Sequence, residues 1–179
     1  ADRNKVLLEL SGVPILLRTL RRFSAVPAVA ELIVVVAKDE VAFVEEMLEK
    51  AQGLKPWRVA QGGAERQYSI ANGMAHLAAN ADVVLVHDAA RPLVSLAAIE
   101  AVIFAAREKG AAIAAVRAKN TIKVVGEDGR VEATPSRASL WEVQTPQGFR
   151  REILERAYEK AAQDGFLGTD DASLVERIG

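Results

Sequence analysis

The chain of 179 residues contains no cysteine, so disulfide bonds, thiol nucleophiles and cysteine-ligated metal centres are excluded. Aromatic residues make up only 5% of the sequence, although half of all residues are hydrophobic. The interior must therefore be built from Ala, Val, Leu and Ile, as in proteins whose helices pack on a parallel sheet. No apolar run approaches the roughly 20 residues that cross a membrane, so we predict no membrane span.

An excess of charge of either sign is also missing, since 23 Lys and Arg residues nearly balance 24 Asp and Glu residues. This balance gives no electrostatic basis for binding nucleic acid or a membrane surface, and we expect neither as a partner. The lack of cysteine is compatible with a reducing compartment, and we expect a cytoplasmic protein. No P-loop, Gly-x-Gly-x-x-Gly or Gly-x-Ser-x-Gly motif occurs, which argues against P-loop kinases, dinucleotide dehydrogenases and α/β-hydrolases.

Short apolar, β-branched runs alternate with helical patterns along most of the chain, which predicts an α/β fold with a parallel sheet and right-handed crossovers. With no linker and no repeat, one domain over residues 1–179 is the simplest interpretation. We predict strands at 31–37, 57–60, 82–87, 111–116 and 141–144, and helices at 15–23, 41–52, 69–79, 96–109 and 150–163. A further helix is expected to start at 169–172, where aspartates suit a helix N-terminus.

The alternation of strands and helices breaks at residues 118–139. Two half-polar runs, 121–125 and 130–134, flank a turn that contains Asp128-Gly129, and this pattern predicts a β-hairpin. An isolated hairpin is only marginally stable in water. We therefore expect the hairpin to pack on another surface, and a partner subunit is one candidate.

A first candidate site is His87-Asp88-Ala89-Ala90-Arg91-Pro92, directly after the predicted strand 82–87. In open α/β sheets, ligands bind beyond the carboxyl ends of the strands. Asp88 could hold a divalent metal or orient a phosphate-bearing substrate, and Arg91 could form paired hydrogen bonds to phosphate. The alternative is a solvated loop in which Asp88 caps a turn. We interpret His87 as a packed or hydrogen-bonded structural residue rather than a base or a metal ligand.

A second candidate site runs from Gln61 to Ser69. Gly62 and Gly63 would let the backbone approach a ligand closely. Ser69, at the predicted start of a helix, would lie near amides that can receive an anion or a base carbonyl. The alternative is an ordinary strand-to-helix turn with a serine cap, and Arg66 could equally be a surface or intersubunit charge.

Four further polar residues carry no signal by themselves: Lys5, Thr121, Arg137 and Thr145. A solvated side chain is the default for Lys5, an ordinary strand position for Thr121 and a surface charge for Arg137. The stretch 145–148, Thr-Pro-Gln-Gly, could be only a turn.

Taken in order, several segments resemble the 2-C-methyl-D-erythritol 4-phosphate cytidylyltransferase family. The His-Asp-Ala-Ala-Arg-Pro string and the Gln-Thr-Pro-Gln stretch are specific in combination, and the resemblance covers nearly the whole chain. The matching segments are 5–8 with 12–16, 62–69, 84–92, 114–116 with 121–123, 140–149 and 169–173.

The resemblance implies a Rossmann-like α/β fold of the nucleotide-diphospho-sugar transferase type. Its mainly parallel, twisted sheet would be flanked by helices, and a β-hairpin dimerisation arm would span about 118–139. The implied reaction transfers CMP from CTP to 2-C-methyl-D-erythritol 4-phosphate, with Mg²⁺ as cofactor and a homodimer as the assembly. The family's N-terminal strand with its Gly-rich loop, and its C-terminal segment, are absent from this sequence. A sheet without a central strand would leave backbone groups unpaired.

The resemblance also implies a role for each candidate residue. Lys5 would contact the triphosphate and act in catalysis, and Asp88 would act at the metal and substrate site. Ala64 departs from the acidic residue often found beside the glycine pair. The remaining implied positions are Gly62, Gly63 and Ser69 around the nucleotide, Arg91 on the substrate, and Thr121, Arg137 and Thr145 around the methylerythritol phosphate.

Two other interpretations stay open at this point. The first is the same chemistry on ribitol 5-phosphate, because that sister family shares much of the pattern. The second is a non-catalytic fragment that keeps the dimer arm and binds ligand weakly or not at all.

Overall fold

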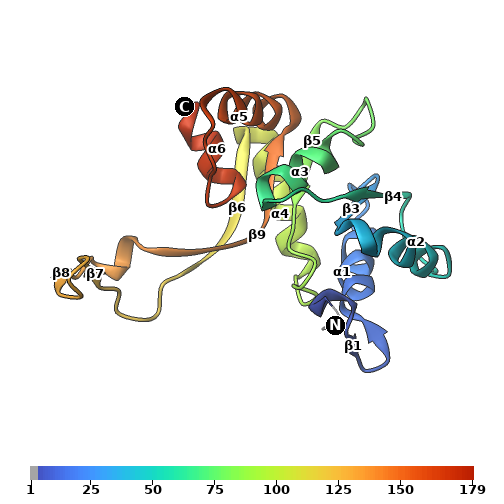
Figure 1. The fold of residues 1–179 in the computed structure, drawn as a ribbon, viewed down its shortest axis with the longest axis horizontal. Helices are drawn as coiled ribbons and strands as arrows, with labels where there is room; N and C mark the ends of the chain where they lie inside the picture. The colour runs from blue at the N-terminus through green and yellow to red at the C-terminus, as the bar shows by residue number, and fades with distance from the viewer. Residues whose placement is uncertain (1–3) are drawn as a thin grey trace.

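The computed structural model describes residues 4–179, in which helices surround two small groups of strands and a long arm projects from one side (Figure 1). Within these residues no helix is both long and apolar enough to cross a membrane. The elements are η1 (Lys5–Leu7), β1 (Glu9–Leu10), β2 (Val13–Pro14), α1 (Ile15–Ser24), β3 (Leu32–Val36), η2 (Lys38–Glu40), α2 (Val41–Glu49), β4 (Trp57–Gln61), α3 (Arg66–Met74), β5 (Val83–Val86), α4 (Leu96–Lys109), β6 (Ala111–Arg117), β7 (Val124–Val125), β8 (Val131–Ala133), η3 (Arg137–Ser139), β9 (Trp141–Arg150), α5 (Arg151–Asp164) and α6 (Asp171–Arg177).

The central strands form two separate sheets. β3 and β4 pair in parallel, as expected for a strand–helix–strand unit, with Leu32 opposite Trp57. In the second sheet β9 lies between β5 and β6 and runs antiparallel to both. A cavity of about 580 Å³ lies between the two sheets, and residues of both β3 and β5 line it.

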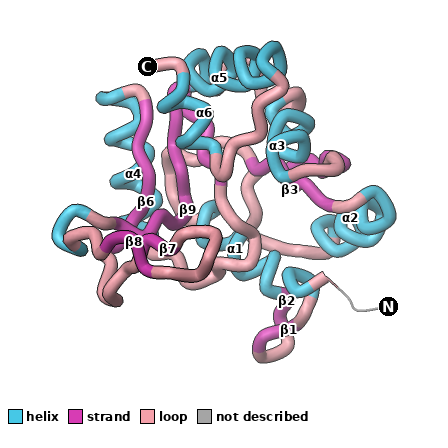
Figure 2. Tube along the Cα trace, turned by 60° about the vertical axis from the view of Figure 1, so that its left-hand side comes forward, coloured by secondary structure: helices cyan, strands magenta, loops and turns pink. Residues whose placement is uncertain are grey.

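Helices cover both faces of the second sheet, as Figures 1 and 2 show. α4 packs on β6 and β9 from one side, where an added Cβ at Gly148 would lie 2.7 Å from Val102. The next residue of β9, Phe149, points to the opposite face and packs fully buried in a cluster with Leu154 of α5 and Leu174 of α6. This alternation along the strand gives the sheet its two hydrophobic faces.

Most predicted elements are confirmed, and two predictions are wrong. The last strand does not stop at 144, because β9 continues to Arg150. Its Thr145-Pro146 peptide bond is cis, and Thr145-Pro-Gln-Gly148 therefore lies inside a strand rather than forming a turn. The helix predicted to start at Ser69 starts at Arg66 and ends at Met74.

The segment 118–139 forms the arm, with the predicted hairpin β7–β8 at its tip (Figure 1). Gly129 adopts a positive φ of 77° in the turn, which explains the Asp-Gly pair at that place. At the root of the arm, the Arg117 guanidinium lies 4.7 Å from the centre of the Trp141 ring. The hairpin prediction is confirmed, although its strands are shorter than the sequence pattern indicated.

Candidate functional site

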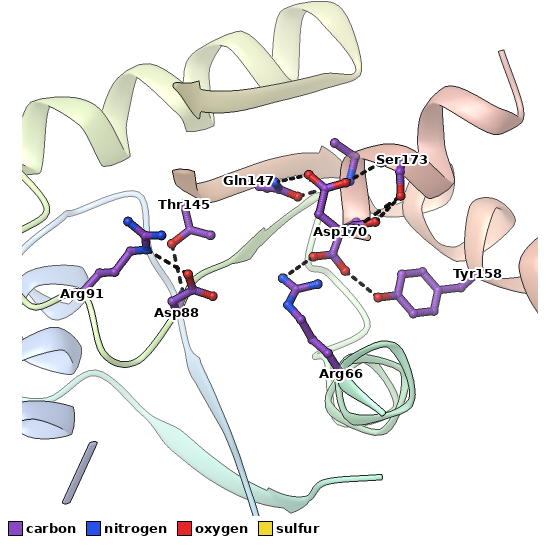
Figure 3. Close-up of polar contacts among 10 residues, drawn as sticks. Arg66, Asp88, Arg91, Thr145, Gln147, Tyr158, Asp170 and Ser173 are labelled. Atoms are coloured by element: carbon purple, nitrogen blue, oxygen red, sulfur yellow. Dashed lines mark hydrogen bonds and ion pairs between the residues drawn. The ribbon is translucent and has the colours of Figure 1, made fainter. Parts of the chain in front are cut away.

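The loop after β5 forms the first part of the site. The Arg91 Nε donates a 2.8 Å hydrogen bond to Asp88 Oδ2, and the backbone amide of Asp88 donates to Thr145 Oγ1 over 3.1 Å (Figure 3). The backbone amide of Arg91 also bonds the carbonyl of Asp88, which closes the loop into a turn. A carboxylate, a guanidinium and a hydroxyl thus meet where β5 ends beside β9.

Two residues behind this loop hold it in place. The buried hydroxyl of Thr19 on α1 donates a 2.7 Å hydrogen bond to the carbonyl of Ala89. The centres of the His87 and Phe23 rings lie 4.7 Å apart, and His87 Nε2 lies 3.1 Å from the carbonyl oxygen of Arg91. Burial lowers the pKa of the His87 imidazole, against smaller opposing effects of that carbonyl and of Asp88. The structural interpretation of His87 is confirmed by this packing.

The second part of the site is the loop that joins β4 to α3. The amide of Gly62 bonds the carbonyl of Val36, and the amide of Gly63 donates to Ser69 Oγ over 3.0 Å. A Cβ at Gly63 would lie only 2.5 Å from the Cβ of Tyr68, so the backbone can take this path only with glycine there. Ser69 closes the loop from within the first turn of α3 and is not its N-cap, which is Glu65.

The first turn of α3 is tied to the segment that leads into α6. Arg66 Nη2 lies 2.7 Å from Asp171 Oδ2, and the Tyr158 hydroxyl donates to Asp171 Oδ1 over 2.5 Å (Figure 3). The side chain of Gln67 bonds two backbone groups of the same segment, the carbonyl of Phe166 and the amide of Gly168. The Arg66 side chain is 43% exposed, which agrees with a surface position, and its guanidinium also pairs with a carboxylate that has no exposed surface.

Gln147 connects the two parts of the site. It lies on β9 two residues beyond Thr145, and its Nε2 donates to Asp170 Oδ2 over 2.7 Å, while its Oε1 accepts from the amide of Ala172. Asp170 caps α6 through a reciprocal pair of hydrogen bonds with Ser173. A continuous path of contacts therefore runs from the Asp88 loop through β9 and the start of α6 to α3.

The structure brings some of the predicted site residues together and separates others. Asp88, Arg91 and Thr145 form one cluster, and Gly62, Gly63 and Ser69 form another. Asp88 and Ser69 both line the cavity between the sheets, as do Asn4 and Val6 on either side of the exposed Lys5.

Thr121 and Arg137 lie on the exposed arm, which extends away from this cavity (Figure 1). Arg137 donates to the carbonyl of Lys119 over 3.0 Å, a contact within the arm itself. A single chain therefore does not place these two residues beside Asp88.

The donor set around Asp88 fits a cation held chiefly by a substrate. Within residues 4–179 no three His, Asp or Glu side chains gather into a group that could hold a metal ion. Asp88 supplies one partly exposed carboxylate, of which Oδ2 contacts Arg91. Mg²⁺ commonly binds one or two carboxylates together with substrate phosphate oxygens and water, and one carboxylate meets that requirement.

Sequence reasoning missed the polar residues that support the site from inside. Three polar side chains are buried in the described part of the chain: Thr19, Gln147 and Asp171. Thr19 bonds the Asp88 loop, Gln147 bonds the start of α6 and Asp171 bonds Arg66 of α3, as buried polar groups must be satisfied. The signal that could have indicated them is a polar residue within an otherwise apolar pattern, as Thr19 is between Leu17 and Leu20.

Comparisons with known proteins give one consistent result. The family model described as 2-C-methyl-D-erythritol 4-phosphate cytidylyltransferase (IspD) matches residues 1–179. The protein of that name from Caldanaerobacter subterraneus subsp. tengcongensis is 43% identical over 177 residues, which are 98% of this chain and 78% of the relative. The one from Symbiobacterium thermophilum is 48% identical over 177 residues, or 98% of this chain and 72% of the relative.

Solved structures agree with the sequence relatives. The chain superimposes on 4-diphosphocytidyl-2C-methyl-D-erythritol synthase from Anaerococcus prevotii with a TM-score of 0.90 and 32% identity, covering 97% of this chain and 78% of that one. The 2-C-methyl-D-erythritol 4-phosphate cytidylyltransferase from Thermus thermophilus gives a TM-score of 0.81 at 32% identity, covering 100% of this chain and 81% of that one. The α/β fold expected from the sequence is thereby confirmed.

Proposed function

The chain belongs to the 2-C-methyl-D-erythritol 4-phosphate cytidylyltransferase family, and we propose on this basis that it transfers CMP from CTP to 2-C-methyl-D-erythritol 4-phosphate. The products are 4-diphosphocytidyl-2-C-methyl-D-erythritol and pyrophosphate, and the reaction serves the non-mevalonate synthesis of isoprenoid precursors. The comparisons favour this substrate over ribitol 5-phosphate, because the matching family and relatives bear its name.

The observation that carries the proposal is that two loops with different chemical groups follow the carboxyl ends of β4 and β5, where α/β sheets bind ligands. The Asp88 loop presents a carboxylate, a guanidinium and a hydroxyl, which suit a phosphate-bearing substrate and its counter-ion. The loop of Gly62 and Gly63, whose path is fixed by close packing on Tyr68 and Ser69, is the loop that we assign to the nucleotide. Hydrogen bonds of Gln147 with the start of α6, and of Asp171 in α6 with Arg66, connect the two loops.

In this arrangement a phosphate oxygen of the methylerythritol phosphate attacks the α-phosphorus of CTP. A new phosphorus–oxygen bond forms, the bond from the α-phosphorus to the bridging oxygen breaks, and pyrophosphate leaves with the electron pair. The attacking monoester is already ionised, so no strong base is required. Positioning and charge neutralisation supply most of the rate in such transfers. We assign the neutralising roles to Lys5 at the triphosphate and to Arg91 at the substrate phosphate.

Asp88 is the carboxylate that we assign to Mg²⁺, together with phosphate oxygens of CTP. The ion would offset the charge of the triphosphate and of the departing pyrophosphate. Asp88 itself also keeps Arg91 oriented through their 2.8 Å contact, so that the guanidinium is placed before the substrate phosphate arrives.

We assign the arm to a homodimer interface, in which Thr121 and Arg137 of one subunit complete the sugar-phosphate side of its neighbour's site. Support comes from the apolar side chains that the arm exposes, among them Val125 at 53% and Val131 at 59%. A hairpin of this size requires a packing partner to be stable.

The absence of cysteine, together with the small phosphorylated substrates, supports a cytoplasmic location.

A pyrophosphate-release assay with CTP tests the function directly. We expect release with 2-C-methyl-D-erythritol 4-phosphate and Mg²⁺, and much slower release with ribitol 5-phosphate or after chelation of the metal. Faster release with ribitol 5-phosphate than with 2-C-methyl-D-erythritol 4-phosphate would show that ribitol 5-phosphate is the substrate. No release with either sugar phosphate would make it a non-catalytic member of the family.

A further inference from the structure

Asp171 is the only charged side chain that is completely buried within residues 4–179. It is the first residue of α6, a helix that carries none of the residues assigned to the reaction. Removing a carboxylate from water is costly unless its oxygens are paired and hydrogen-bonded. Such a residue needs an explanation, because an apolar side chain at the same place would fill the space without that cost.

Both oxygens of the Asp171 carboxylate are in use. Oδ1 accepts the Tyr158 hydroxyl over 2.5 Å, and Oδ2 accepts Arg66 Nη2 over 2.7 Å. Burial, followed by the charge of Asp171 and its hydrogen bond, raises the pKa of the Tyr158 phenol well above its ordinary value, so Tyr158 stays a donor. Tyr158 comes from α5 and Arg66 from α3, so the carboxylate joins three helices.

Arg66 is the place where this buried contact reaches the nucleotide loop. It lies three residues after Gly63 and three before Ser69, which bond each other through the 3.0 Å contact of the Gly63 amide with Ser69 Oγ. Ser69 therefore fixes the loop from its own helix, and Arg66 fixes the first turn of that helix against Asp171. The Arg66 side chain is 43% exposed, and it lines the cavity between the sheets.

We propose that Asp171 is a positioning residue that acts through Arg66 to hold the Gly62–Ser69 loop in the arrangement that binds CTP. Losing the Asp171–Arg66 contact should therefore weaken CTP binding and leave the affinity for the sugar phosphate nearly unchanged. The inference rests on the proposed function, since CTP must be a substrate.

The contrast with the Asp88 loop sharpens this expectation. That loop is held by hydrogen bonds of Thr19 and Thr145, and neither of these hydrogen bonds involves Asp171 or Arg66. Gln67 would still tie α3 to the segment before α6 through its two backbone contacts. Loss of the ion pair should thus loosen the orientation of the nucleotide loop without detaching the helix.

The test compares Asp171→Asn, Arg66→Gln and the double variant with the unsubstituted natural protein. Asp164→Asn is the matched control, because Asp164 also pairs with two side chains near the C-terminus, Lys160 and Arg177, but away from α3. Calorimetric titration with CTP alone and steady-state KM values for both substrates are measured. We expect each single variant to weaken CTP binding and raise KM for CTP about tenfold, as for loss of a charge-assisted hydrogen bond.

The double variant should be no worse than the worse single variant, because both changes remove the same contact. KM for the sugar phosphate and all values of the control should stay close to those of the unsubstituted protein. Unchanged CTP binding in either single variant would overturn the proposal, as would effects that multiply in the double variant. If Asp171→Asn does not fold, Arg66→Gln carries the same test from a partly exposed position. Absence of turnover in the unsubstituted protein would instead contradict the proposed function.

Discussion

Asp82 and Asp88 lie at opposite ends of the same strand, and each pairs with an arginine. Asp82 precedes β5 and contacts Arg107 over 3.1 Å, whereas Asp88 follows β5 and contacts Arg91 over 2.8 Å. Ligands of α/β sheets bind beyond the carboxyl ends of the strands, so only Asp88 has the position for chemistry. Substitutions of Asp88 and Asp82 therefore distinguish an effect on catalysis from the mere loss of a surface ion pair.

Asp88→Asn should lower kcat about 100-fold or more, in the range seen when one group that stabilises transition-state charge is removed. Its backbone contact with Thr145 does not depend on the carboxylate, so the fold should survive. Asp82→Asn, which breaks an equivalent exposed ion pair, should change neither kcat nor KM appreciably. Steady-state pyrophosphate release measures both, and equal rates for the two variants would remove Asp88 from the catalytic site.

His87 should make stability depend on pH. Burial lowers its pKa in the folded protein, so the unfolded chain binds the additional proton more readily. The contribution of the neutral His87 to the stability of the folded protein is fully present above the ordinary histidine pKa. It is lost as the pH falls from there through the lowered pKa that His87 has in the folded protein.

Urea unfolding of the natural protein at about pH 7 and about pH 5, on either side of the ordinary histidine pKa, measures this loss. The fall in unfolding free energy should be smaller in His87→Gln. The exposed His76 supplies the matched variant His76→Gln, which should keep the full pH dependence. Equal losses in the two variants would show that His87 does not carry the effect.

At the scale of elements, the sequence predicted most of the fold because its local patterns agree with the final structure. The apolar run of β3, the helical spacing of α4 and the Asp-Gly turn of the hairpin each determine an element by themselves. The second part of β9, from residue 145 to 150, could not be predicted in the same way. Its Thr-Pro-Gln-Gly stretch has turn-forming residues, and only pairing with β5 and β6 makes it a strand.

The site shows the same division between local and long-range information. Asp88 and Arg91 are three residues apart, and their contact follows from one loop. The contact of Arg66 with Asp171 joins residues 105 positions apart, so no local pattern indicates it. Resemblance to a family supplied roles for single residues, whereas the buried contacts that hold those residues required the structure.

The arm supplies a prediction at this scale. Arg137→Ala should raise KM for 2-C-methyl-D-erythritol 4-phosphate about tenfold, through loss of a charge-assisted contact with phosphate, and should change KM for CTP little. Arg130→Ala is the control, because Arg130 lies on the same arm and forms its ion pair within the hairpin turn, with Asp128. Comparable changes in both variants, or a larger change in KM for CTP, would place Arg137 elsewhere than on the sugar phosphate.

At the scale of the whole molecule, the separation of the arm from the cavity is the reason for proposing a site shared by two chains. Asp88 follows β5 in the body and Arg137 belongs to η3 of the projecting arm, so a single subunit does not bring both to one substrate (Figure 1). If the arm of one subunit reaches its neighbour, each site combines the body of one chain with the arm of the other. Variants in the two places should then complement each other.

Asp88→Asn and Arg137→Ala subunits, each poorly active alone at low sugar-phosphate concentration, should regain activity when they are unfolded together and refolded. In a mixed dimer one site carries both substitutions and the other carries neither, so random pairing should restore about a quarter of the natural activity. Mixing either variant with itself should restore nothing, and sedimentation velocity should show dimers in every sample. Dimers without recovery would mean that each arm serves its own subunit, and monomers with full activity would remove the arm from the site altogether.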